Sequence, residues 1–508
     1  MKQFDASLLQ FAPKGSFYNT QDEQLKKIEE VWRDFFNYDR DIFSLSTILP
    51  GTAYSKGRMA HMLLSNPIDR DNKSLVPYGL NDKFESTIIN WNLEHESMAR
   101  SLKNLLMLTG PKGKNKSLKR VNNARTKKVI LRYIFDRDIN SLESMAIKFK
   151  SKITKLIRHA LGKDLLKVVN AKNGTPEGRL AYKYVTRYNM HGMNIIRFLF
   201  GGEVGDGLKK LKAYRAVQNA AKSKDVDAYI KIAEMKVLPV EVLMGFRNTY
   251  KLDIDKDKIY EFGKMSERQK IQSKVAAGKA GVEIDIDYSK HDIYDLWKLF
   301  YLQTVKEQTD DIDEIAAAIT KKSEEKLGID LGDTVVIFDV SKSMEGSVKR
   351  QWHPFLTGLS LISKLDNVKE VIFAGGKIIK TGSEKIPSVI IPSGSTALWK
   401  ALIEAAEHKP KTVVVVSDGY ENEIKGSFDG VYTKLKEDGA SFNLIHANPV
   451  FSSEVSGLKQ LAEDVQPMAL DNYKYLKTNL IFKLITTDKE QVKKLFANEY
   501  KKQITKEV

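Results

Sequence analysis

Hydrophobic residues recur with a helical period over most of the first 325 residues. In EQLKKIEEVWRDFF, residues 23–36, they follow one another at spacings of three and four, which places them on one face of a helix. Thr20 and Glu23 precede this run in a capping-box arrangement that favours a helix start. Similar periods occur over 89–108, 126–135, 142–161, 213–235 and 292–308. The pattern predicts a stack of antiparallel helices, and without a clean fixed period a repeat array is only inferred.

The pattern changes after about residue 330. Short runs of β-branched residues, 334–340, 370–375, 388–392, 412–418 and 442–447, alternate with segments expected to be helical, such as 396–408 and 454–464. Strands that alternate with helices predict a doubly wound α/β domain with a mostly parallel sheet. The expected fold class is therefore all-α followed by α/β, with domains at 1–330 and 331–508.

Bulk composition narrows the class of protein. No apolar run approaches the roughly 18 residues that a membrane helix needs, so we expect a protein without a membrane partner. The start of the chain has no sustained apolar segment typical of a secretory signal, and the chain has no cysteine. These features favour a cytoplasmic location.

The net charge of +17 is concentrated in one segment. Residues 101–200 hold 23 Lys and Arg against 5 Asp and Glu, whereas the other 408 residues are almost neutral. Concentrated positive charge is typical of a protein that binds a polyphosphate, although a solvated lysine-rich surface without a partner is the alternative. The candidate phosphate-binding residues are Lys112, Lys114, Lys116, Lys119, Arg120, Arg125, Lys127, Lys128, Lys148, Lys152, Lys155 and Arg158. Tyr182, Tyr184 and Tyr188 could stack on RNA bases, but core packing is the favoured interpretation for them.

Oxygen-bearing side chains follow two of the predicted strands. In VVIFDVSKSMEG, residues 335–346, Asp339 ends a buried strand, and Ser341 and Ser343 follow it. Thr396 stands in a Gly/Ser loop before a predicted helix, and Asp418 ends another strand. Ligands of parallel sheets bind beyond the carboxyl ends of the strands, so these residues are expected to converge. Carboxylate and hydroxyl oxygens suit a hard cation, most favourably Mg²⁺ and otherwise Mn²⁺.

Other chemistries find no support in the sequence. The segment GPKGKNKS has two residues between Gly110 and Gly113, where a phosphate loop needs four. There is no H-E-x-x-H pair for zinc, and no catalytic triad can be assigned from sequence alone. We expect a binding protein rather than an enzyme.

The three metal loops, in this order, resemble the metal-ion-dependent adhesion site of von Willebrand factor A domains over about 331–508. The resemblance implies that Asp339, Ser341, Ser343, Thr396 and Asp418 hold the ion, which leaves a coordination position open for an acidic group of a partner. The whole chain, with a basic helical part joined to such a domain, is similar to the Ro proteins. That similarity rests on 292–308 leading into the first metal loop, on SGSTALWKAL and SDGYENEIKGSFDGVY, and on IAEMKVLPVEVLMGF in the helical part.

The Ro resemblance implies a TROVE module, a ring of HEAT-like helical repeats that binds noncoding RNA, with a Rossmann-like A domain after it. The RNA would be Y RNA-like or a misfolded RNA with a single-stranded 3′ end, in RNA quality control or scaffolding, and an exoribonuclease is an implied partner. Two alternatives stay open. The protein could be a metal-dependent protein-interaction scaffold, or an accessory subunit of an ATPase machine.

Overall fold

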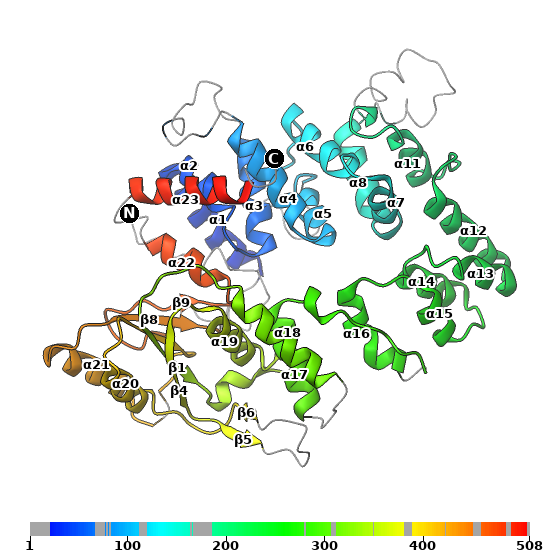
Figure 1. Ribbon diagram of the computed structural model, residues 1–508. Helices are drawn as coiled ribbons and strands as arrows, with labels where there is room; N and C mark the ends of the chain where they lie inside the picture. Colours follow the sequence, from blue (N-terminus) through cyan, green and yellow to red (C-terminus); the bar gives the residue numbers. More distant parts are fainter. Residues whose placement is uncertain are drawn as a thin grey trace. The chain divides into compact units, whose positions relative to one another are not determined.

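The structure is a computed structural model of the chain (Figure 1). It describes residues 21–66, 77, 80, 83–110, 119–162, 165, 185–278, 281–305, 311–348, 350–379, 389–421, 423–450, 459–483 and 489–504. In that part of the chain, no helix combines the length and the apolar character needed to cross a membrane.

The chain forms two compact units. The sheet unit holds the described parts of 1–55, 75–80 and 288–508, and the helical unit holds those of 56–74 and 81–287. This division differs from the predicted boundary at residue 330, because the first two helices and the helices after residue 288 belong to the sheet unit and pack with its other helices. The predicted fold class, all-α followed by a parallel α/β sheet, is confirmed. A closed ring of helices stays a prediction.

The helical unit is built from short helices joined by turns. Side-chain oxygens fix several helix starts: Asn123 accepts from the backbone N–H of Thr126 at 2.8 Å, and Asp225 accepts from that of Ala228 at 2.9 Å. The described helices, with α3 beginning in the sheet unit, are α3 (Ala53–Ser65), α4 (Phe84–His95), α5 (Met98–Met107), α6 (Ala124–Phe135), α7 (Ile139–Lys148), α8 (Lys150–Leu161), α11 (Gly192–Leu199), α12 (Lys209–Ser223), α13 (Val226–Ala233), α14 (Val240–Tyr250), α15 (Lys256–Phe262) and α16 (Glu267–Gly278).

The sheet unit contains a five-stranded sheet with helices on both of its faces (Figure 1). Its helices are α1 (Gln21–Tyr38), α2 (Arg40–Ser46), η3 (Tyr288–Lys290), α17 (Ile293–Val305), α18 (Ile312–Glu324), η4 (Lys342–Glu345), α19 (His353–Lys364), α20 (Leu398–Glu407), α21 (Ser427–Glu437), α22 (Tyr475–Lys483) and α23 (Lys489–Ile504). Its strands are β1 (Thr334–Asp339), β2 (Gly346–Ser347), β3 (Arg350–Gln351), β4 (Val368–Ala374), β5 (Lys377–Ile379), β6 (Val389–Ile391), β7 (Thr412–Val416), β8 (Asn443–Asn448) and β9 (Met468–Ala469).

The main sheet has the order β4-β1-β7-β8-β9, and all of its pairs are parallel. Every residue of β1 is buried, as expected for a central strand covered on both faces. Asp339 is the last residue of β1 and pairs in register with Ala374 of β4. The register therefore carries Asp339 to the carboxyl edge of the sheet.

A glycine lets α19 approach the sheet closely. A Cβ atom at Gly358 would lie 2.4 Å from Cε2 of Phe338, which no real side chain tolerates. The ring of Phe338 also stacks on Phe355 of the same helix, with 5.3 Å between centroids. Glycine at position 358 is thus required for this packing of α19 on β1.

Two details of the predicted α/β pattern are wrong. The run 388–392 was expected in the parallel sheet, but β6 pairs antiparallel with β5 in a separate hairpin. The segment 454–464 was expected to be helical, and its described part, 459–464, forms turns and a bridge between Ala462 and Val465. Leu461, Ala462 and Val465 pack into the sheet core in this non-helical form, so tertiary packing overrides the local period.

The N-terminal and C-terminal helices of the sheet unit are joined through Asp39. Its Oδ1 accepts from the backbone N–H groups of Asp41 and Ile42, both at 3.0 Å, and so caps α2. Its Oδ2 lies 2.8 Å from Nζ of Lys489 and 3.3 Å from Nζ of Lys493, both in α23. Burial raises the pKa of Asp39, but Lys489, the Ile42 amide and Lys493 lower it more, so the net pKa is below 3.8.

Asp39→Ala is expected to destabilise the protein by about 3 kcal/mol, because it leaves two lysines without their nearly buried partner and uncaps α2. Asp39→Asn keeps the cap and is expected to cost less. Since the folded pKa is lowered, the ion-pair contribution is present above pH 4 and is lost as the pH falls through the folded pKa. Urea unfolding of the three proteins between pH 3 and pH 7 measures both effects. Parallel pH profiles for Asp39→Asn and the parent would contradict this assignment.

Candidate functional site

The first predicted metal loop folds back onto the end of β1. The backbone N–H of Ser341 donates to Oδ1 of Asp339 at 2.9 Å. The hydroxyls of Ser341 and Ser343 lie 3.0 Å apart, so both point to the same place. The D-x-S-x-S spacing thus gathers one carboxylate and two hydroxyls, as the sequence indicates.

A further hydroxyl, that of Ser417, belongs to the same site and was not predicted. Its Oγ donates to Oδ2 of Asp339 at 2.6 Å and accepts from the backbone N–H of Gly419 at 3.0 Å. Ser417 stands at the end of β7, next to β1 in the sheet. Its place beside Asp418 in the sequence VVVVSD was the signal that could have found it.

Asp418 is held at the same edge. The backbone N–H of Tyr420 donates to Oδ1 of Asp418 at 3.0 Å, and the side chain of Asn448 donates to the Asp418 carbonyl at 2.9 Å. Asp418 lies close enough to Asp339 for its charge to act on that carboxyl. Two carboxylates from neighbouring strands therefore face one site.

The loop that carries Thr396 packs against the first metal loop through its backbone. The N–H of Ser393 donates to the carbonyl of Val340 at 2.9 Å, and the N–H of Lys342 donates to that of Gly394 at 3.1 Å. The hydroxyl of Thr396 donates to the carbonyl of Ala374, at the end of β4, at 3.2 Å. The third predicted segment thus also lies at the carboxyl edge of the sheet.

The electrostatics of this edge fit a cation. Burial raises the pKa of Asp339 to about 6, and the charge of Asp418 adds to that effect, although Ser417 and Ser341 oppose it with hydrogen bonds. A divalent ion would offset both causes, because its charge compensates two adjacent carboxylates. The described residues hold no group of three or more His, Cys, Asp and Glu side chains that could bind a metal. A metal at this edge would therefore depend on hydroxyl ligands as well as on the two acids.

The site opens to solvent on one side. Asp339, Ser341, Thr396 and Asp418 are buried, whereas Ser343 is exposed. A cation held by the buried oxygens would keep its exposed side for water or for an acidic group of a partner.

Glu421 fixes the loop that follows Asp418. Its Oε1 accepts from the hydroxyl of Ser427 at 2.9 Å and from the backbone N–H of Phe428 at 2.6 Å. Its Oε2 accepts from the backbone N–H of Gly426 at 2.8 Å. One carboxylate thereby accepts the hydrogen bonds of the donors at the start of α21 and connects this helix to the metal loop.

Glu421→Ala is expected to destabilise the protein by about 1–2 kcal/mol, because it removes the acceptor at the start of α21. It is also expected to weaken Mn²⁺ binding by about tenfold or more, as loss of a residue that orients a metal loop usually does. Urea unfolding and Mn²⁺ titration measure the two effects. Glu437→Ala, an exposed carboxylate in the last turn of the same helix, is the control and should change neither. An unchanged Mn²⁺ affinity in Glu421→Ala would separate this loop from the metal site.

The predicted basic residues have different environments. Lys119, Arg120, Lys127 and Lys128 are exposed, the first two just before α6 and the others within it. Lys112, Lys114 and Lys116 lie outside the described residues.

Arg125 is held within the helical unit. Its guanidinium nitrogens lie 3.2 Å from Oε2 of the buried Glu85, and its Nε donates to the hydroxyl of Ser86 at 3.2 Å. Arg125 is therefore better explained as a structural ion pair than as a phosphate ligand.

The basic residues of α7 and α8 also differ in their exposure and their partners. Lys155 and Arg158 are three positions apart on the exposed face of α8. Lys152 is half-buried, with its amine 5.3 Å from the centre of the Phe149 ring. Lys148 lies 3.9 Å from Glu241, a long ion pair that solvent screens.

His159 links the segment before α6 to α8. Its Nε2 lies 2.7 Å from the carbonyl of Val121. Burial lowers the pKa of His159, the Val121 bond raises it, and the positive charges of Arg120 and Lys127 lower it further. The charges of the α6 region therefore act at α8. We call the exposed residues Lys127, Lys128, Lys155 and Arg158, which lie on these two packed helices, the basic surface.

Aromatic side chains accompany this surface, although not the predicted ones. Tyr182 and Tyr184 lie outside the described residues, and Tyr188 is half-buried in a turn. The guanidinium of Arg158 lies 5.3 Å from the centre of the half-buried ring of Phe200. Phe200 follows a helical run in the sequence and gave no signal of this contact.

No known family model and no curated protein matches this sequence. Among solved structures, the chain is similar to the Ro (RSR) protein of Deinococcus radiodurans, with a TM-score of 0.46 and 12% sequence identity. The alignment covers 94% of this chain and 98% of that chain. The sequence motifs of this chain also resemble those of the Ro proteins.

Proposed function

We propose that this protein binds noncoding RNA on the basic surface of its helical unit and holds a divalent cation at the carboxyl edge of its sheet. The observation that carries the first part is the concentration of charge: Lys127, Lys128, Lys155 and Arg158 are exposed on α6 and α8, in a segment with 23 basic and 5 acidic residues. The rest of the chain is almost neutral. A partner made of phosphates accounts for this localisation.

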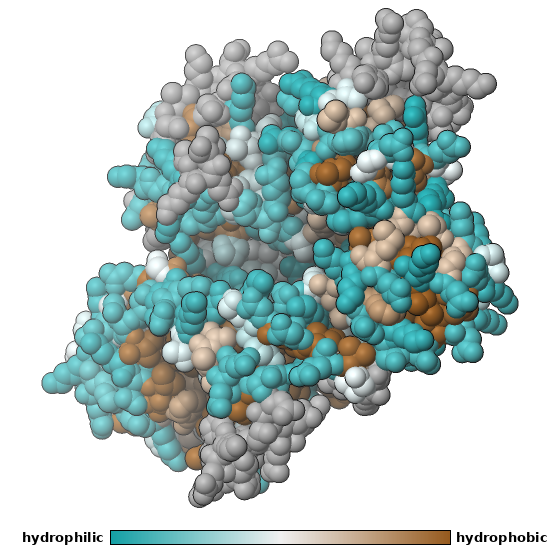
Figure 2. All heavy atoms as spheres, turned by 45° about the vertical axis from the view of Figure 1, so that its right-hand side comes forward, coloured by the Kyte–Doolittle hydropathy of each residue, from teal (hydrophilic) through white to brown (hydrophobic). Residues whose placement is uncertain are grey.

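The surface suits an extended polyanion. Hydrophilic side chains cover much of the face drawn in Figure 2, with hydrophobic patches between them. Lysines and arginines bind the phosphates of nucleic acids with an affinity that depends steeply on salt and little on sequence. Lys152 lies over the ring of Phe149, and Arg158 lies over the ring of Phe200. When these two basic side chains move aside to contact phosphates, the rings would be available for stacking with unstacked RNA bases.

The finer features of this function follow the Ro resemblance. The RNA would be Y RNA-like or misfolded with a single-stranded 3′ end, in quality control or scaffolding. The protein would act in the cytoplasm without catalysing a reaction, and an exoribonuclease is the proposed protein partner.

A second function is favoured by the geometry at Asp339. Asp339 and Asp418 with the hydroxyls of Ser341, Ser343 and Thr396 would hold Mg²⁺ or Mn²⁺, which supplies an electrophilic site for a carboxylate of a partner protein. The exposed Ser343 leaves that side of the site accessible. The sheet unit would then be a metal-dependent docking domain.

The test of RNA binding is a titration of the purified protein with a labelled structured RNA that ends in a single-stranded 3′ tail. DNA of equal length is the comparison, and both are measured from 50 to 300 mM salt. We expect tight binding that prefers RNA and falls steeply with salt. Absence of binding at 50 mM salt would mean that the basic segment is a solvated surface without an RNA partner. Metal-dependent docking would then be the proposed function.

A further inference from the structure

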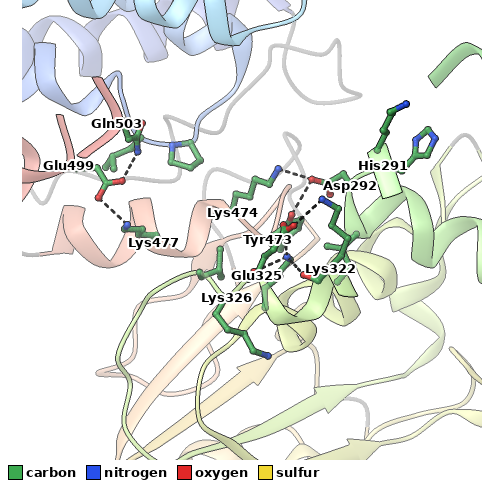
Figure 3. A pocket seen from close by; sticks show the side chains of 16 residues that line it. His291, Asp292, Lys322, Glu325, Lys326, Tyr473, Lys474, Lys477, Glu499 and Gln503 are labelled. Carbon is green, nitrogen blue, oxygen red and sulfur yellow. Dashed lines mark hydrogen bonds and ion pairs between the residues drawn. The ribbon is translucent and has the colours of Figure 1, made fainter. Parts of the chain in front are cut away.

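The sheet unit contains a cavity of about 590 Å³ away from the metal loops (Figure 3). Its walls come from the segment at Pro50, from η3 and the start of α17, from the end of α18 and the residues after it, from the end of α19, from the start of α22 and the residues before it, and from the end of α23. None of the five predicted metal ligands lines it. The cavity is therefore a separate site within this unit.

Lysines dominate the walls of the cavity. Three acidic residues line it, Asp292, Glu325 and Glu499, so the lining carries an excess of three positive charges. The six lysines that line it are Lys290, Lys322, Lys326, Lys364, Lys474 and Lys477.

Each carboxylate already has a lysine partner. Nζ of Lys474 lies 2.7 Å from Asp292, Nζ of Lys322 lies 3.0 Å from Glu325, and Nζ of Lys477 lies 3.1 Å from Glu499. Figure 3 shows these pairs around the cavity. The acids are therefore offset within the walls, and the lining still holds more lysines than carboxylates.

Two other lysines bind mainly neutral acceptors. Lys364 is only 5% exposed, and its amine donates to the carbonyls of Lys322 and Glu325, with a Glu325 carboxylate oxygen at 3.5 Å. Burial lowers the pKa of Lys364 more than Glu325 raises it. The exposed Lys326 donates to the carbonyl of Ser363 at 3.2 Å. A carbonyl oxygen satisfies a hydrogen bond of an ammonium group without offsetting its charge, so the charge of Lys326 is available to an anion and that of Lys364 is shared with Glu325.

We propose that this cavity binds a compact polyphosphate chain, either free or as the phosphates of a nucleoside triphosphate. Lysine ammonium groups, with three donors on a flexible stem, serve as point charges for phosphate oxygens. The net positive charge of the lining attracts an anion in proportion to the charge of that anion, so several linked phosphates are favoured over a single one. The volume lies within the range of small-molecule sites, about 300–1,000 Å³.

The lining does not provide a surface for a nucleobase. Its aromatic side chains among the described residues are Tyr473 and His291, which are 3% and 5% exposed. The hydroxyl of Tyr473 is also bonded to Asp292 at 3.1 Å. Recognition therefore falls on the phosphates, and tripolyphosphate should bind about as well as ATP.

The test is isothermal titration calorimetry of the full chain with sodium tripolyphosphate and with ATP, in metal-free buffer at constant ionic strength. We expect one site, with affinities for the two probes within about threefold of each other, since a base without contacts adds little. Lys326→Gln is expected to weaken tripolyphosphate binding about tenfold, the typical effect of losing one charge-assisted hydrogen bond. Lys434→Gln is the matched control, because Lys434 is exposed on α21, pairs with Asp438 and does not line the cavity. It should leave both affinities unchanged.

The outcomes are distinct from those for RNA and metal binding. Asp339→Asn should keep the tripolyphosphate affinity, because Asp339 lies outside the cavity. Absence of binding, or equal losses in Lys326→Gln and Lys434→Gln, would overturn the proposal. ATP binding more than about tenfold tighter than tripolyphosphate would also overturn it, because it would require recognition of the base.

Discussion

Asp339→Asn is expected to weaken Mn²⁺ and Mg²⁺ binding by more than about a hundredfold, since even residues that only orient metal ligands cost ten- to a hundredfold. Asparagine has the same size, and its side-chain oxygen still accepts from the Ser341 amide, while its NH2 group replaces Oδ2 and can donate to the Ser417 hydroxyl, so the loop keeps its form. It lacks the negative charge that would attract the ion. Calorimetric titration with Mn²⁺ measures the loss.

Two controls accompany this variant. In EDTA it should be at least as stable as the parent in urea, because burial and the charge of Asp418 raise the pKa of Asp339 to about 6 and make its charge unfavourable without a cation. Asp438→Asn, an exposed carboxylate at the end of α21, should bind Mn²⁺ like the parent. RNA binding by Asp339→Asn should be unchanged. An equal loss of RNA and metal binding would contradict separate roles for the two units.

Replacing Lys127, Lys128, Lys155 and Arg158 with glutamine is expected to weaken RNA binding by about a hundredfold at moderate salt, if each surface charge contributes about 0.7 kcal/mol. The slope of log affinity against log salt should fall by about three, because four phosphate contacts on a single strand each contribute roughly 0.7. Fluorescence anisotropy with the tailed RNA across the salt series measures both. All four side chains are exposed, so the fold should be kept.

A matched set of four exposed lysines in the sheet unit serves as the control. Lys369, Lys400, Lys409 and Lys434 carry the same total charge, and their replacement with glutamine changes the net charge equally. This set should leave RNA affinity nearly unchanged. Similar losses for both sets would mean that RNA responds only to the overall charge, which would remove the role assigned to α6 and α8.

The metal loops could be predicted because each depends on few residues at short spacing. A buried β-branched strand that ends in D-x-S-x-S places Asp339, Ser341 and Ser343 within one turn, whatever the rest of the chain does. The convergence of Asp418 followed from the rule for parallel strands. The position of Ser417 next to Asp418 was a signal that it lies at this edge, but its hydrogen bond to Asp339 depends on β7 lying beside β1, and the sequence pattern does not give the order of the strands.

The errors have the same origin. The run 388–392 has the composition of a buried strand, yet it pairs with β5, and residues 459–464 have a helical period but pack as turns. The helical period over residues 89–108 is confirmed, although it did not indicate the break between α4, which ends at His95, and α5, which begins at Met98. The local spacing of hydrophobic residues indicates whether a long element is a helix or a strand. It does not indicate which elements pair with it or where it is interrupted.

The assignment of Arg125 was wrong for a similar reason, because a count of charged residues does not show which partner each of them has. The sequence assigned it to the phosphate surface with its neighbours, but Glu85, forty residues earlier, holds its guanidinium. Lys326 and Lys364 gave no signal in the sequence, because the cavity that they line is assembled from six distant segments.

The link between Asp39 and Lys489 has a consequence for synthesis on the ribosome. The sheet unit is made from the two ends of the chain, while nearly all of the helical unit is one continuous stretch between them. The helical unit can therefore complete its contacts while the chain is still growing, since domains generally fold as their residues emerge. Helix α2 must wait for α23, about 450 residues later, before its capping carboxylate gains its two lysines. A ribosome that stops before residue 489 would release a folded helical unit attached to a sheet unit that lacks α23, in which Asp39 has neither of its two lysine partners.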